Sequence, residues 1–320
     1  MARVLVTRHL TPGGTDPLID AGHEIVARTD DIPLTPESLA AQAAECDGIV
    51  CLLTDRIDAD VLAAGHAGHL KVVANAAVGY DNIDVATATA WGITVCNTPG
   101  VLDATTADLA FLLILAATRS STEAEDDLRG GRWAGWGFTT NLAQDVHGTT
   151  LGLVGYGRIA QAVARRAAGF DMTVLHTARN DTGQPGYIPT LHELLQRSDI
   201  VSLHVPLTES TRHLIGAAEL ALMKATAVLV NTARGPVIDE DALVDALQAG
   251  TLHGAGLDVF EGEPAVNPRL LAAPRITLLP HVGSATVDTR TRMARLACQG
   301  VCDVLAGRVA PNEVRVGQTA

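Results

Sequence analysis

A glycine-rich turn lies between an apolar strand pattern and a helical pattern in the middle of the chain, where the sequence reads LGLVGYGRIA. Gly155, Gly157 and Ala160 form a GxGxxA pattern. The first glycine permits a tight turn, the second lets the backbone approach a pyrophosphate, and the third position needs only a small side chain for helix–sheet packing. The following helix N-terminus offers N–H donors and the positive end of its dipole. The order of strand, turn and helix predicts a dinucleotide site, the alternative being a glycine turn without a ligand.

Short apolar runs alternate with helical patterns on both sides of this turn. The first series, before residue 96, has the strand patterns RVLVT, EIVAR, GIVCLL and LKVVANA. The second begins at Leu151 and has LGLVG, MTVLH, DIVSLHV, AVLVN, GAGLDVF and ITLLP. Such alternation indicates βα units on a parallel sheet. The sequence therefore predicts an α/β fold with two Rossmann-like, doubly wound parallel-sheet domains.

The domain boundaries follow from a hinge and a helix. The sequence NTPGV, residues 97–101, is a Pro-Gly hinge signal between the two series. Residues 285–307 carry apolar side chains at helical spacing, which predicts one long helix with an apolar stripe. We expect this helix to pack back on the first series. The prediction is a discontinuous substrate domain of residues 1–100 plus 285–320, and a dinucleotide-binding domain of residues 101–284.

Composition limits the partners and the compartment. The net charge of −13 argues against nucleic acid or an anionic membrane as a partner, so an anionic ligand needs a local cationic pocket. The five cysteines form no CxxC motif, which predicts reduced thiols in a cytoplasmic protein. The N-terminus is a strand pattern without a signal-peptide core. The apolar run at residues 109–118 is too short to span a bilayer and predicts a buried helix at an interface.

The strand after the glycine turn ends in a cation. Its sequence, VLHTARND, places Arg179 where a dinucleotide-binding unit usually has an acidic residue for the ribose. A 2′-phosphate on that ribose needs a cation and is repelled by a carboxylate, so Arg179 favours NADP(H). In the alternative, Arg179 is a solvated loop residue and Asp181 reaches the ribose, which suits NAD(H).

Three later stretches place polar residues at predicted strand ends, where open α/β sheets bind ligands. VNTARGPVIDEDAL contains Arg234, GLDVFEGEP contains Asp258 and two glutamates, and LLPHVGSAT contains His281. A histidine beside a carboxylate is suited to acid catalysis, and an arginine to a carboxylate substrate. Singly, His281 could be a structural histidine and Arg234 a surface ion pair. The acidic run 239–241 is interpreted as a helix N-cap and first turn, without a role in the site.

At this point the sequence resembles the D-isomer-specific 2-hydroxyacid dehydrogenases. The resemblance covers nearly the whole chain through VGYDNID, NTPGVLDATTADLA, LGLVGYGRIA, HVPLT, VNTARGPVIDEDAL, GLDVFEGEP and PHVGSAT. It implies a cleft between the two domains and a homodimer joined through the cofactor domain. The apolar helix after Leu102 and the loop with Trp133 and Trp136 would supply that contact. It implies no metal.

The resemblance also implies a role for each matching residue. His281 would be the acid/base, Glu263 its carboxylate partner and Arg234 the group that binds the substrate carboxylate. The N–H groups of Val78 and Gly79 would complete the carboxylate pocket, and Leu53 and Trp136 would shape it. The implied cofactor contacts are Thr106, Gly155, Gly157, Arg158, Ile159, Arg179, His204, Val205, Pro206, Thr232, Ala233, Asp258, His281 and Gly283.

Among the subtypes, the glyoxylate/hydroxypyruvate reductases are most similar. They share VGYDNID, an arginine after the second strand of the cofactor domain, and a tryptophan loop matching Gly135 and Trp136. The implied reaction is hydride transfer from NADPH, or from NADH, to a small anionic 2-keto acid. The alternatives are an NAD-preferring enzyme of D-lactate or phosphoglycerate type, and a dinucleotide-sensing protein similar to the corepressors of this fold. Ala160 departs from the third glycine, and the segment 180–189 is short for this family.

Overall fold

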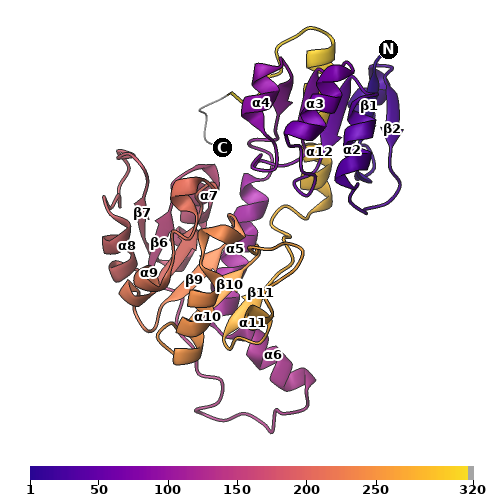
Figure 1. Ribbon diagram of the computed structural model, residues 1–320. Helices are drawn as coiled ribbons and strands as arrows, with labels where there is room; N and C mark the ends of the chain where they lie inside the picture. The colour runs from indigo at the N-terminus through magenta and orange to yellow at the C-terminus, as the bar shows by residue number, and fades with distance from the viewer. Residues whose placement is uncertain (316–320) are drawn as a thin grey trace. The chain divides into compact units, whose positions relative to one another are not determined.

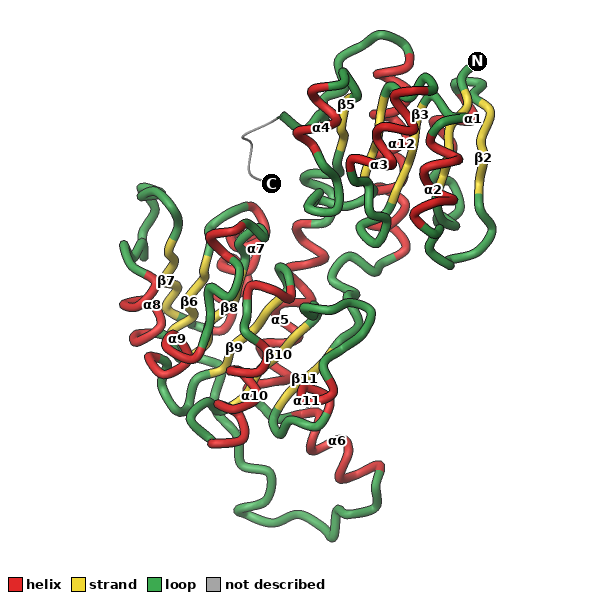
Figure 2. The backbone as a smooth tube through the Cα atoms, in the orientation of Figure 1, coloured by secondary structure: helices red, strands yellow, loops and turns green. Residues whose placement is uncertain are grey.

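The computed structural model describes residues 1–315, and the chain within it divides into two compact units (Figures 1 and 2). Unit 1 comprises Met1–Leu102 together with the C-terminal segment from Ser284, and unit 2 comprises Asp103–Gly283. Residues 316–320, the end of the segment assigned above to the substrate domain, lie outside the described residues. The functional roles of the two units, substrate and dinucleotide, stay predictions.

Unit 1 contains a parallel sheet. Its five described strands follow the order β2-β1-β3-β4-β5. They are β1 (Arg3–Val6), β2 (Glu24–Ala27), β3 (Gly48–Cys51), β4 (Val72–Asn75) and β5 (Thr94–Cys96). The helices of this unit are α1 (Asp16–Asp20), α2 (Pro36–Ala43), α3 (Ala59–Ala67), α4 (Val85–Ala90) and α12 (Val287–Leu305). The strand patterns before residue 96 are therefore confirmed, while α4 and β5 were not anticipated.

The predicted C-terminal helix is α12, and it packs on the sheet of unit 1 beside β3, β4 and α1 (Figure 1). Thr286 caps it by accepting a hydrogen bond from the Thr289 N–H. Met293, Ala297 and Val301 lie on the buried stripe. Since these side chains complete the core of unit 1, the chain must return from unit 2 before that core can close.

Unit 2 contains the second parallel sheet, whose six described strands follow the order β11-β10-β9-β8-β6-β7. They are β6 (Thr150–Val154), β7 (Thr173–Thr177), β8 (Ile200–Leu203), β9 (Val228–Asn231), β10 (Gly254–Leu257) and β11 (Ile276–Leu278). From β6 the chain passes to β7 on one side and later to β8 on the other. The end of β6 is therefore the point where the strand order reverses, the usual ligand position in such sheets. The two-sheet α/β fold is confirmed.

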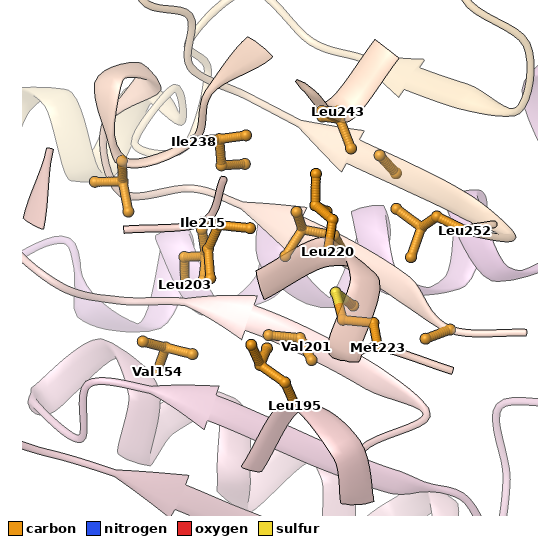
Figure 3. Close-up of a cluster of buried hydrophobic side chains, with 14 of the residues drawn as sticks. Val154, Leu195, Val201, Leu203, Ile215, Leu220, Met223, Ile238, Leu243 and Leu252 are labelled. Atoms are coloured by element: carbon orange, nitrogen blue, oxygen red, sulfur yellow. The ribbon is translucent and has the colours of Figure 1, made fainter. Parts of the chain in front are cut away.

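Helices cover both faces of this sheet (Figure 2). They are α5 (Asp103–Thr118), α6 (Ser121–Arg129), α7 (Arg158–Ala167), α8 (Leu191–Arg197), α9 (Ala217–Leu222), α10 (Glu240–Ala249) and α11 (Pro268–Leu271), with short 3-10 turns at Ala168–Phe170, Glu209–Thr211 and Gly235–Val237. One core cluster, drawn in Figure 3, includes Val154, Leu203 and Leu243. The other lies against α5 and α7 and includes Ile114 and Val163. The predicted apolar helix is thus α5, and half of its 16 residues are buried.

Candidate active site

The glycine turn closes tightly against the neighbouring strand. Gly155 has φ +88°, and a Cβ there would lie 2.6 Å from the carbonyl oxygen of His204, so no larger residue fits. Gly157 caps α7 without a side-chain hydrogen bond, and a Cβ on it would meet no atom within 4 Å. The turn therefore offers open space above a helix end whose first N–H groups have no helical partner. This arrangement fits a pyrophosphate.

The residues that follow β8 meet the same turn. Val205 lies beside Gly155, and Pro206 follows it. The ring Nε2 of His204 lies 3.0 Å from Ser202 Oγ. Desolvation lowers the pKa of His204 from 6.5 to about 4, so this ring is neutral at neutral pH. The structure thus brings His204 and Val205 to the glycine turn, and Pro206 is the next residue along the chain.

The end of β7 carries Arg179, which is exposed and makes no ion pair among residues 1–315. Asp181 is engaged locally, since its Oδ1 accepts the Gly183 N–H at 2.8 Å. The following segment folds back on β7: the N–H of His176 donates to the Gly186 carbonyl at 2.9 Å, and Ile188 N–H to the His176 carbonyl at 2.8 Å. The short segment 180–189 is therefore ordered by β7.

The buried imidazole ring of His176 contacts the segment 180–189 through Thr182. His176 is fully buried, lies 2.6 Å through Nε2 from Thr182 Oγ1, and stacks on Tyr156 with ring centroids 3.7 Å apart. Burial lowers its pKa, so the imidazole is held in the neutral form. Sequence reasoning missed this pair, although Tyr156 stands inside the GYG turn.

The predicted acid/base pair is formed in unit 2. Nδ1 of His281, in the loop after β11, lies 2.8 Å from Oε2 of Glu263, and the other oxygen of Glu263 accepts the Phe260 N–H at 2.9 Å. Burial alone would raise the pKa of Glu263. The hydrogen bond and charge of His281, the Phe260 N–H and the charge of Arg234 outweigh burial, and the pKa is lowered. Glu263 is therefore a carboxylate beside the imidazole.

Asp258, at the end of β10, positions the segment after His281. Its side chain is buried, and its two oxygens accept the N–H groups of Val282 and Gly283, each at 2.8 Å. Burial raises its pKa, opposed by these hydrogen bonds. A Cβ on Gly283 would lie 3.1 Å from Asp258 Oδ2 and 3.5 Å from Thr106 Cγ2. Thr106, Asp258 and Gly283, three of the residues predicted to contact the cofactor, therefore lie together.

The loop after β9 carries Thr232, Ala233 and Arg234. The buried Asn231 shapes it, because its Nδ2 donates to the Arg234 carbonyl at 2.8 Å and its Oδ1 accepts the Ala233 N–H at 2.9 Å. Sequence reasoning missed Asn231. The Oγ1 of Thr232 is buried and has no protein partner among the described residues, so it is available to a ligand. This orphaned hydroxyl also fits a bound dinucleotide.

In unit 1, the carbonyls of the Val78–Gly79 turn are held by two asparagines. Asn97 Nδ2 donates to the Val78 carbonyl and Asn75 Nδ2 to the Gly79 carbonyl, both at 2.7 Å. The N–H groups of Val78 and Gly79 donate to no protein acceptor among residues 1–315. They are therefore available for a carboxylate. Leu53, also predicted to shape the pocket, is 36% exposed.

Three other side chains in the motifs singled out from the sequence are either engaged elsewhere or exposed to solvent. Arg158 uses its side chain in an ion pair with Asp103 at 3.2 Å, which leaves Ile159 and the helix N–H groups for the predicted contact. Glu261, in the same stretch as Glu263, pairs with His213 instead. Trp136 is 83% exposed on the loop after α6.

Within the described residues, no three His, Cys, Asp or Glu side chains are grouped to hold a metal ion. No helix of that part of the chain is long and apolar enough to cross a membrane.

Comparisons with known proteins identify the family of the chain. The family model described as "D-isomer specific 2-hydroxyacid dehydrogenase, NAD binding domain" matches residues 111–283, which lie in unit 2. A glyoxylate reductase of Korarchaeum cryptofilum is 47% identical over 98% of this chain and 95% of its own length.

Solved structures extend the similarity to the whole fold. A Thermus thermophilus protein superposes with a TM-score of 0.92 at 43% identity, covering 98% of this chain and 100% of its own. An NADPH-dependent glyoxylate/hydroxypyruvate reductase of Sinorhizobium meliloti, in complex with NADP and malonate, has a TM-score of 0.85 at 36% identity, covering 98% and 96%.

Proposed function

The chain belongs to the D-isomer specific 2-hydroxyacid dehydrogenase family and is an NAD(P)-dependent oxidoreductase, and on this basis we propose that it reduces glyoxylate or hydroxypyruvate to the D-2-hydroxy acid. The observation that carries the proposal is the His281–Glu263 hydrogen bond of 2.8 Å, with the charge of Arg234 acting on the same carboxylate. The similar proteins named as glyoxylate or glyoxylate/hydroxypyruvate reductases support this choice of substrate.

The residues of unit 2 fit a nicotinamide dinucleotide. The open turn at Gly157, the uncapped N-terminus of α7 and the unpartnered Thr232 hydroxyl would hold it, with Thr106, Asp258 and Gly283 at a further subsite. When bound in its reduced form, the dinucleotide supplies the hydride. Strands β9, β10 and β11 are neighbours in the sheet, so their C-terminal ends put Arg234, Asp258 and His281 on one edge.

Each protein group has a distinct task in this reaction. Protonated His281 donates its proton to the oxygen of the reduced carbonyl, and the Glu263 carboxylate orients the ring and stabilises its positive charge. Arg234 binds the substrate carboxylate and stabilises negative charge that develops on the carbonyl oxygen. The N–H groups of Val78 and Gly79 remain proposed carboxylate donors. A protein of net charge −13 therefore needs these local donors to bind an anion.

We also propose a preference for NADP(H), with NAD(H) accepted. Arg179 follows β7 as an exposed cation without an ion pair in the described chain, while Asp181 accepts a hydrogen bond from its own turn. Both observations support Arg179 as the group that binds a 2′-phosphate.

The proposed assembly is a homodimer through unit 2. Leu112 on α5 and Trp133, Trp136, Phe138 and Leu142 are large apolar side chains left exposed in one protomer. Large apolar side chains exposed on one protomer can be covered in an interface, and two of these, Trp136 and Phe138, lie against each other. In such a dimer we propose that Trp136 limits substrate size, so Trp136→Ala should improve kcat/KM for a bulkier keto acid relative to glyoxylate.

The five free, buried thiols support a reducing, cytoplasmic location.

A matrix of kcat/KM values tests the proposal. The substrates are glyoxylate, hydroxypyruvate, pyruvate and a bulkier keto acid, each with NADPH and NADH. We expect glyoxylate or hydroxypyruvate with NADPH to give the highest value. No turnover of any of the four with either cofactor would contradict the proposal, and a maximum with NADH would contradict the NADP(H) preference alone.

A further inference from the structure

Glu240 is a buried carboxylate with no task in the reaction described above. It is the first residue of α10, where acidic side chains usually stabilise the helix dipole from solvent, yet it is only 6% exposed. Asp239 supplies the N-cap by accepting the Ala242 N–H, so capping does not require Glu240. The predicted N-cap and first turn at residues 239–241 are confirmed, and what the sequence did not indicate is the burial of Glu240.

The carboxylate of Glu240 holds the segment that carries Glu263. Its Oε1 accepts the Glu261 N–H at 2.7 Å, a contact between residues 21 positions apart. The preceding N–H, that of Phe260, donates to Glu263 itself at 2.9 Å. The consecutive N–H groups of Phe260 and Glu261 thus donate to two carboxylates, that of Glu263 within the segment and that of Glu240 outside it.

The same segment packs against the turn that carries Arg234. A Cβ on Gly235 would lie 1.9 Å from the Phe260 carbonyl carbon, so the two backbones are in direct contact. Glu261 extends the junction, since its Oε1 lies 3.0 Å from Nε2 of His213, and the His213 N–H donates to the Pro236 carbonyl at 2.7 Å. Glu240 therefore lies where the Arg234 turn, the Glu263 segment and the start of α10 meet.

We propose that Glu240 is a positioning residue for the acid/base pair, acting through the Glu261 N–H to hold Glu263 against His281. The inference rests on the proposed function for its kinetic readout. What the junction requires from Glu240 is an acceptor oxygen at the right distance. A neutral amide keeps that oxygen, whereas an apolar side chain of similar length removes it and leaves the Glu261 N–H without an acceptor.

The test compares Glu240→Gln with Glu240→Met, and uses Asp245→Asn as the matched control. Asp245 lies on the same helix, is 70% exposed and binds Arg269 rather than the segment backbone. We expect Glu240→Met to lower kcat by about 10- to 100-fold per folded molecule, with the KM for NADPH unchanged, because a small displacement of a catalytic group has such an effect. Glu240→Gln should lose less than about threefold, as expected for a retained hydrogen bond, and Asp245→Asn should match the wild type.

A spectroscopic readout is independent of turnover. The Nδ1–H proton of His281, identified by its loss in Glu263→Gln, should give a downfield proton NMR signal in the wild type and in Glu240→Gln. It should be lost or shifted in Glu240→Met. If Glu240→Met lowered Tm but kept this signal and the wild-type kcat, Glu240 would be structural only, and equal damage from Glu240→Gln would overturn the acceptor role. A wild type inactive on all 2-keto acids would refute the proposed function, while the NMR comparison would still decide the role of Glu240.

Discussion

At the scale of single residues, the site depends on charges that are matched locally. Glu263 is kept ionised by His281 and Arg234, while His204 and His176 are kept neutral by burial. Burial thus keeps two of the protein's eleven histidines neutral, whereas His281 lies beside the Glu263 carboxylate, although their sequence contexts do not distinguish the three. A residue's neighbours in space, more than its type, decide its charge.

The cofactor preference is a prediction at this scale. Arg179→Ala should raise the KM for NADPH by about tenfold or more, because a charge-assisted hydrogen bond to phosphate contributes about 1.5–3 kcal/mol. The KM for NADH should change by less than about threefold, since without a 2′-phosphate no such bond exists. Arg197→Ala, which removes a half-exposed arginine paired with Glu193, is the control. Equal effects of Arg179→Ala on both cofactors would make Arg179 a solvated surface residue.

A pH dependence follows from His204. Its folded-state pKa of about 4 is below the ordinary 6.5, so the unfolded chain takes up a proton between these values that the folded protein does not. The free energy of unfolding should therefore fall as pH decreases from about 6.5 to about 4, by of order 1–3 kcal/mol from this residue. In His204→Gln this part should be absent. Urea titrations at pH 7 and pH 5 measure it, and an unchanged pH dependence in the variant would refute it.

At the scale of elements, the ends of the strands could be predicted from the sequence, but the side chains that hold the loops after these strands could not. The apolar runs and the glycine turn are local signals, so they placed β6, α7 and the residues Arg234, Asp258 and His281 correctly at strand ends. Asn231 and Glu240 were missed for two reasons. Asn231 acts on backbone groups two and three residues away, and nothing in the residue type indicates this. Glu240 acts across 21 residues, which only the folded chain brings together.

The loops of unit 1 depend on a buried ion pair. Arg8 NH1 lies 2.7 Å from Asp55 Oδ1, and both side chains are nearly inaccessible. Asp55 Oδ2 also accepts the Leu52 N–H, and Asn82 Nδ2 donates to the carbonyls of Leu52 and Asp55. Through Asn75, whose Nδ2 donates to Asn82 Oδ1, the network reaches the turn at Val78 and Gly79.

Asp55→Asn should therefore destabilise the protein by about 3–5 kcal/mol, because it leaves a buried arginine without a counter-charge. The midpoint of urea unfolding measures this loss. The control is Glu45→Gln, which removes an exposed partner of Arg3 in the same unit and should leave the midpoint nearly unchanged. If both variants unfolded at the same urea concentration, the Arg8–Asp55 pair would have no special role in the unit.

At the scale of the whole molecule, each unit has its own sheet and its own buried core. The acid/base pair, Arg234 and the glycine turn all belong to unit 2, which is continuous in sequence. Unit 1 needs both ends of the chain, since α12 completes its core. The proposed acid/base and dinucleotide residues thus belong to one uninterrupted unit, while the proposed carboxylate donors Val78 and Gly79 belong to unit 1.

The most direct test of the central claim is the kcat for glyoxylate of the wild type and of His281→Gln, with NADPH binding measured by fluorescence. We expect turnover by the wild type, a loss of about 10²- to 10⁴-fold in His281→Gln, as for removal of a general acid, and an unchanged Kd for NADPH. A variant that reduces glyoxylate as fast as the wild type would contradict the account, because the proton would then come from another group.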